Sequence, residues 1–131
     1  MNIIWFKDCS YENKNKVGGK NASLGELYNL SKNLNFKIAN GFAITTDLYD
    51  NFIENNKLNN LVEESMNSVN VDDIDDLNKK SQYIKNLFNE ASFTEDQINE
   101  ILKNFKILKD FYTENIQVAV RSSAIAEDLP N

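Results

Sequence analysis

The sequence predicts a small α/β or α+β domain of about three strands and four or five helices. Three observations predict this class: short apolar or β-branched runs, apolar residues that repeat at helical spacing, and turn-forming residues between these segments. The chain has 131 residues, which is the size of one domain, and 41% of them are hydrophobic, which is enough to build a core. We therefore expect residues 1–131 to form a single domain.

Three segments are predicted to be strands. Residues 2–6 (NIIWF) are a short apolar run, and residues 41–45 (GFAIT) form a second one. Residues 117–121 (QVAVR) are rich in valine and place Arg121 at the carboxyl end of the predicted strand. Ligands often gather at this end of the strands in α/β proteins.

In most of the remaining sequence, apolar residues repeat at helical spacing and predict helices. A helix is predicted to start at Ser23, because Ser23 and Glu26 fit a capping box, and the spacing of its leucines marks one face of that helix. A second capping box, Thr94 with Gln97, predicts a helix with a long apolar stripe. Further helices are predicted after Thr46, from about residue 58, and after the aspartates at 72–76, which fit a solvated helix start better than a metal site.

Composition excludes several kinds of function. A net charge of −6 argues against a nucleic-acid partner, and no apolar run is long enough to span a bilayer, so no membrane partner is expected. Without a signal-peptide pattern, the expected location is the cytoplasm. The chain has no histidine, which removes the commonest general base, the commonest metal ligand and any phosphohistidine carrier. Whatever residues 1–131 do, they do without an imidazole group.

Two segments place a cation among small, flexible residues at the junctions of predicted elements. In residues 17–27 (VGGKNASLGEL), Gly18 and Gly19 precede Lys20 and a helix start, whose free N–H groups and partial positive charge favour anions. In residues 118–130 (VAVRSSAIAEDLP), the planar guanidinium of Arg121 suits phosphate oxygens.

The hydroxyls of Ser122 and Ser123 can donate further hydrogen bonds to such a ligand. Neither segment fits a familiar nucleotide loop: Lys14 stands where a Walker A loop needs glycine, and Lys20 stands where a dinucleotide fingerprint needs it. Taken alone, the first segment also fits an ordinary turn with a solvated Lys20. The second also fits an arginine paired with a carboxylate such as Glu127 or Asp128.

Both segments, with IANGFAITTDLY at residues 38–49 between them, closely resemble the N-terminal nucleotide-binding domain of the phosphoenolpyruvate synthase family. The resemblance implies an ATP-grasp fold, in which ATP lies between two subdomains. It also implies that Lys20 and Arg121 contact the ATP phosphates, and that Gly18 and Gly19, with the following serines Ser122 and Ser123, shape the site. Magnesium is implied as well, with ligands beyond Asn131.

The same resemblance implies that the parent protein is an ATP-dependent dikinase. Its partners would be ATP and two downstream domains of the same polypeptide, one carrying a phosphohistidine and one binding pyruvate. Residues 1–131 are then the first part of the ATP-binding portion, cut off at its C-terminal end, and are expected to be inactive alone. Two alternatives stay open: an antibiotic-directed enzyme of the rifampin phosphotransferase type, and a free-standing module without catalysis.

Overall fold

A computed structural model describes residues 1–112 and 115–126, and it divides into two compact units. The first unit comprises Met1–Tyr49 and Glu95–Asn131, and the second comprises Asp50–Thr94. Within the described residues there are two strands and five α-helices: β1 (Ile3–Trp5), α1 (Lys14–Ser31), β2 (Phe42–Ile44), α2 (Thr46–Asn55), α3 (Leu58–Asn67), α4 (Ile74–Glu90) and α5 (Glu95–Tyr112). None of these helices has an apolar stretch long enough to cross a membrane.

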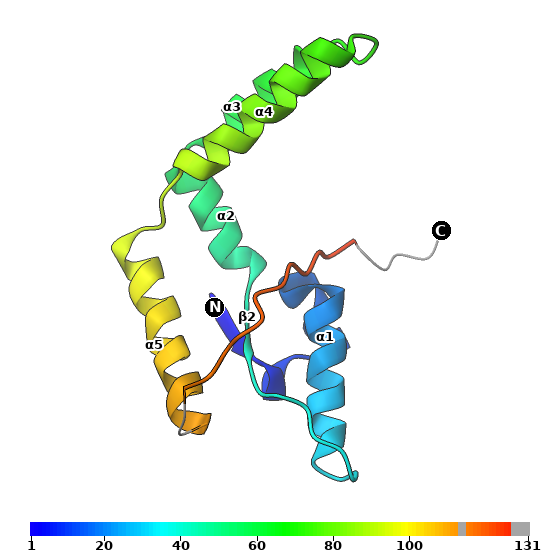
Figure 1. Cartoon of the computed structure of the whole chain (residues 1–131), viewed down its shortest axis with the longest axis vertical. Coiled ribbons are helices and arrows are strands. Elements are labelled where there is room, and N and C mark those ends of the chain that lie inside the picture. The colour runs from blue at the N-terminus through cyan, green and yellow to red at the C-terminus, as the bar shows by residue number, and fades with distance from the viewer. Residues whose placement is uncertain (113–114, 127–131) are drawn as a thin grey trace. The chain divides into compact units, whose positions relative to one another are not determined.

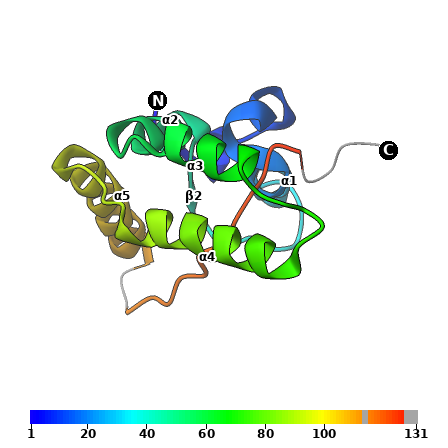
Figure 2. The same ribbon diagram turned by 90° about the horizontal axis from the view of Figure 1, so that it is seen from above.

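Strands β1 and β2 form an antiparallel pair at the centre of the first unit. Ile4 lies opposite Ala43, and Trp5 lies opposite Phe42, so both predicted N-terminal strands are confirmed. The pair lies between α1 and α5 (Figures 1 and 2). The indole Nε1 of Trp5 donates a 2.9 Å hydrogen bond to Asn104 Oδ1 and thereby attaches β1 to α5.

The third predicted strand is wrong. Residues 115–126 contain neither helix nor strand in the part of the chain that the structure describes, and Val120 is 94% exposed. Valine-rich sequence favours a strand only where a partner strand supplies hydrogen bonds and packing, and neither described strand pairs with this segment. The fold is consequently more helical than the α/β prediction.

The first helix is placed differently from its prediction. Helix α1 begins at Lys14 rather than at Ser23, and the side chains of the expected capping box serve Tyr11 instead. Ser23 Oγ lies 3.0 Å from the Tyr11 hydroxyl, and Glu26 Oε1 accepts the Tyr11 backbone N–H. The leucine face of α1 is half-exposed: Leu27 is 43% exposed and Leu30 is 51% exposed.

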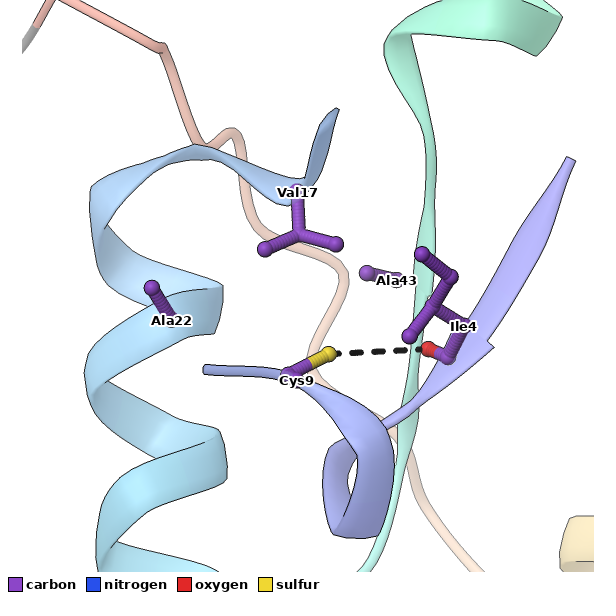
Figure 3. Close-up of a cluster of buried hydrophobic side chains, with 5 residues drawn as sticks. All are labelled: Ile4, Cys9, Val17, Ala22 and Ala43. Carbon is purple, nitrogen blue, oxygen red and sulfur yellow. Dashed lines mark hydrogen bonds between the residues drawn. The ribbon is translucent and has the colours of Figure 1, made fainter. Parts of the chain in front are cut away.

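The buried face of α1 is made of small residues. Val17 and Ala22 pack with Ile4, Cys9 and Ala43 in the core of the first unit (Figure 3). One turn after Ala22, a Cβ on Gly25 would stand 2.1 Å from the Cys9 carbonyl oxygen and 2.5 Å from Cys9 Cβ. Helix and loop can approach this closely because Gly25 has no side chain.

Replacement of Gly25 by alanine is therefore expected to destabilise the protein by about 2 kcal/mol. The gain in helix propensity, about 1 kcal/mol, is smaller than the cost of moving two backbones apart. Urea unfolding of Gly25→Ala measures the change, with Leu30→Ala as the matched control on the same helix. A Gly25→Ala protein as stable as the wild type would contradict the close contact.

Cys9 makes stability depend on pH in the alkaline range. Its thiol is 1% exposed and lies 3.8 Å from the Ile4 carbonyl oxygen (Figure 3). Burial, followed by the neighbouring Asp8 carboxylate, raises the pKa of Cys9 from its ordinary 9.0 to about 11. Between these values the unfolded chain has lost the thiol proton and the folded chain has kept it, so the free energy of unfolding falls as pH rises.

We expect the wild type to lose about 2 to 3 kcal/mol relative to Cys9→Ala between pH 9 and pH 11, and nothing below pH 8. Urea unfolding of both proteins across this range measures the difference, because all other titrating groups are shared. A difference that stays constant from pH 8 to pH 11 would show that Cys9 is not shielded from water.

The second unit contains a helical hairpin of α3 and α4. The core of this unit is formed by Phe52 and Ile53 of α2 and Leu58 of α3, with Leu87 and Phe88 of α4 packed against them. The Asp73 carboxylate accepts hydrogen bonds from the backbone N–H groups at 75 and 76, directly before α4. The predicted helix start within the aspartate cluster is thereby confirmed.

Candidate functional site

The glycine turn breaks α1 in two. Gly18 has φ 78° and ψ 165°, and it alone within the helix departs from helical angles. Such a backbone conformation is almost restricted to glycine. The second part of α1 thus starts immediately after Gly18, and Lys20 is an exposed residue of its first turn. Gly18, Gly19 and Lys20 were predicted to lie just before a helix that begins at Ser23; only Gly18 lies outside helical angles, and Gly19 and Lys20 belong to the first turn that follows it.

The second predicted segment lies directly on this turn. The Gly19 backbone N–H donates a 3.2 Å hydrogen bond to the Ala124 carbonyl oxygen, and the Asn21 N–H donates one of 3.3 Å to Ser123 Oγ. A Cβ on Gly18 would stand 2.3 Å from Ser123 Oγ and 2.6 Å from the Ser123 carbonyl oxygen. Two segments more than 100 residues apart in sequence are therefore in contact, as Figures 1 and 2 show at the start of α1.

These bonds occupy amides at the observed helix start. The sequence predicted free N–H groups at a helix start near Ser23, whereas the helix restarts after Gly18 and the N–H groups of Gly19 and Asn21 there are occupied by Ala124 and Ser123. The Asn21 side chain contributes a further bond within the turn, from Nδ2 to the Val17 carbonyl oxygen at 2.8 Å. The side chains, rather than these two amides, are left to bind an anion.

Lys20 and Arg121 line one open cleft of about 1520 Å³ in the first unit. Ser122 and Ser123 also line it. The structure therefore brings together four of the six predicted site residues as cleft-lining groups, and Gly18 and Gly19 form the buried turn beside them. The alternative partners of Arg121, Glu127 and Asp128, lie outside the described residues.

The remaining walls of the cleft are largely apolar. They come from the leucine face of α1, from β2 and from α5, and include Leu24, Leu27, Phe42, Leu102 and Phe105. Pockets of this kind, apolar with a few placed polar groups, suit small organic ligands. Two cations that line such a cleft can neutralise a polyanion, while the apolar walls can hold an uncharged ring.

Metal ligands were not expected within this chain. Across residues 1–112 and 115–126, no three histidine, cysteine or carboxylate side chains are grouped so that they could hold a metal ion.

The sequence did not reveal the role of Asn21, because its backbone amide is the contacting group and backbone groups carry no sequence signal. Ala124 was missed for the same reason, since its carbonyl oxygen is the acceptor.

The chain is similar in sequence to a known protein family and to several known proteins. Residues 14–131 match the family model described as pyruvate phosphate dikinase, AMP/ATP-binding domain. A phosphoenolpyruvate synthase of Helicobacter pylori is 37% identical over 130 residues, which are 98% of this chain and 16% of that protein. One of Pseudomonas aeruginosa is 39% identical over 115 residues, which are 88% of this chain and 14% of that protein.

A third relative, the phosphoenolpyruvate synthase of Aquifex aeolicus, is 34% identical over 131 residues, again 98% of this chain. The chain spans about 15% of the length of that protein. The two segments that carry Lys20 and Arg121, residues 17–27 and 118–126, both fall within the region that matches the family model.

Proposed function

The chain belongs to the family of pyruvate phosphate dikinase AMP/ATP-binding domains, and from this premise we propose that it is the N-terminal ATP-binding part of a phosphoenolpyruvate synthase. In the whole protein, ATP, pyruvate and water would be converted to phosphoenolpyruvate, AMP and phosphate. A phosphohistidine on another domain would carry the phosphoryl group, since residues 1–131 contain no histidine. The chain would form one side of an ATP-grasp site.

One observation carries the proposal: two cationic segments from opposite ends of the chain line the same cleft and are joined by hydrogen bonds. Lys20 would contact the ATP phosphates as a mobile point charge, and Arg121 as a planar fork of donors. Ser122 and Ser123 would complete the polar wall, above the turn of Gly18 and Gly19. The apolar wall from α1 and α5 would take the adenine ring.

The chemistry would depend on electrostatics. Phosphoryl transfer moves negative charge among phosphate oxygens, and cations held in place before the reaction stabilise that charge. Mg²⁺ would add to this neutralisation when ATP is bound. From the family to which the chain belongs, we propose that the protein ligands of Mg²⁺ lie outside residues 1–131.

Product analysis of the full-length protein tests the proposal. We expect ³¹P NMR of a reaction with ATP, Mg²⁺ and pyruvate to show AMP, phosphate and phosphoenolpyruvate in equal amounts. Omission of pyruvate should leave only phosphorylated protein and its co-products. A full-length protein that consumes ATP with rifampin but not with pyruvate would exclude the synthase and support the antibiotic-directed alternative. A protein that never forms AMP would support the non-catalytic alternative.

A further inference from the structure

We infer that Ser123 is a positioning residue, which holds Lys20 and Arg121 at a fixed separation by capping the second part of α1. This inference rests on the proposed function for its effect on ATP. The capping contact itself is a property of the fold. Ser123 would act through the backbone amide of Asn21, not through a phosphate oxygen.

The two residues next to Lys20 in sequence both donate backbone hydrogen bonds to the segment that contains Ser123. The residue before it, Gly19, donates to Ala124, and the residue after it, Asn21, donates to Ser123. The backbone of Lys20 is therefore fixed on both sides to one short segment. Arg121 lies two residues before Ser123 on that same segment, so one segment both carries Arg121 and bonds to the backbone on either side of Lys20.

Ser123 acts as the N-cap of the second part of α1, a role that the residue directly before a helix normally has. An N-terminal cap is a side-chain oxygen that accepts a backbone N–H of the first helical turn. Gly18, which precedes this turn, has no side chain and cannot provide such an oxygen. Ser123 supplies it from 102 residues away, and the missing Cβ of Gly18 leaves the room that its hydroxyl needs.

A serine hydroxyl at position 123 can act as the acceptor that the Asn21 N–H requires. The Oγ of Ser123 accepts the Asn21 N–H through a lone pair, so its own proton stays available for a further acceptor. Alanine at this position would leave the Asn21 amide at the helix start without its acceptor. The link between the two segments would then depend on the Gly19 to Ala124 bond.

Amide hydrogen exchange of the full-length protein tests the cap directly. In Ser123→Ala, the segment that contains Asn21 should exchange about fivefold faster than in the wild type, and Ser123→Thr, which keeps the oxygen, should restore most of the protection. Ser81→Ala, an exposed serine of α4, is the matched control. Unchanged exchange at Asn21 in Ser123→Ala would overturn the inference, whatever the activity of the protein.

A double-mutant cycle tests the positioning role. We expect Ser123→Ala to lower kcat/KM for ATP about fivefold to tenfold, measured as labelling of the carrier histidine. If Ser123 acts through the cations, adding Ser123→Ala to Arg121→Ala should cost less than twofold more. Fully additive losses would show that Ser123 contacts ATP itself and would overturn the inference, as would normal kcat/KM in Ser123→Ala. Normal labelling in Lys20→Ala would instead contradict the proposed function and leave the exchange test standing.

Discussion

Alanine in place of Lys20 or Arg121 is expected to reduce ATP-dependent labelling of the carrier histidine about 100-fold or more in the full-length protein. Both side chains line the same cleft, and each would balance charge that appears on phosphate oxygens during transfer. The reduction should fall mainly on kcat, because this charge is greatest in the transition state. Rapid-quench measurement with radiolabelled ATP gives the rate of the labelling step.

Two further variants sharpen this prediction. Arg121→Lys keeps the charge but loses the planar fork, so it should recover only part of the rate. Lys106→Ala removes an exposed lysine of α5 that does not line the cleft, and it should label at the wild-type rate. Near-normal labelling in both Lys20→Ala and Arg121→Ala would remove these residues from the phosphate site.

Alanine in place of Gly18 should lower the free energy of unfolding by about 2 to 4 kcal/mol. Two costs add: the backbone angles of Gly18 are strained for any other residue, and the new Cβ would meet Ser123 at 2.3 Å. The protein can relieve the second cost only by moving Ser123 away from the turn. Urea unfolding measures the loss of stability.

Gly19→Ala is the matched control for this measurement, because Gly19 is the next residue and has helical backbone angles. In a helix alanine is favoured over glycine by about 1 kcal/mol, so the backbone angles favour alanine at position 19, whereas at position 18 they oppose it. A Gly18→Ala protein no less stable than Gly19→Ala would show that residues 122–124 do not dock on the turn as described.

The sequence predicted the elements whose signals are local. The apolar runs at residues 2–6 and 41–45 became β1 and β2, and the capping pattern at Thr94 marked the start of α5 within one residue. For α1 the leucine spacing marked a helix face that is half-exposed, not the buried one. Its buried side carries Val17, Ala22 and Gly25, because the close approach of the Cys9 loop leaves room only for small residues.

The sequence named Lys20, Arg121, Ser122 and Ser123, which line one cleft, but not the bonds that hold the cleft together; that these residues bind ATP stays a prediction. The pairing of the two segments followed from the resemblance to a family, since a glycine turn and an arginine taken separately fit common alternatives. The hydrogen bonds of Ser123 and Ala124 involve backbone partners 102 and 105 residues away, which leave no local pattern. The strand expected at residues 117–121 failed for a related reason: its formation depends on a partner, and neither described strand pairs with it.

The long-range link at the glycine turn also sets an order of events during synthesis. Ribosomes add about 5 to 20 residues per second, so roughly 5 to 20 s separate the emergence of Asn21 from that of Ser123. During this interval the α3–α4 hairpin can fold, because its contacts are local. The bonds from Asn21 to Ser123 and from Gly19 to Ala124 can form only after residues 123 and 124 have emerged, so the two segments of the cleft meet after the hairpin has been synthesised.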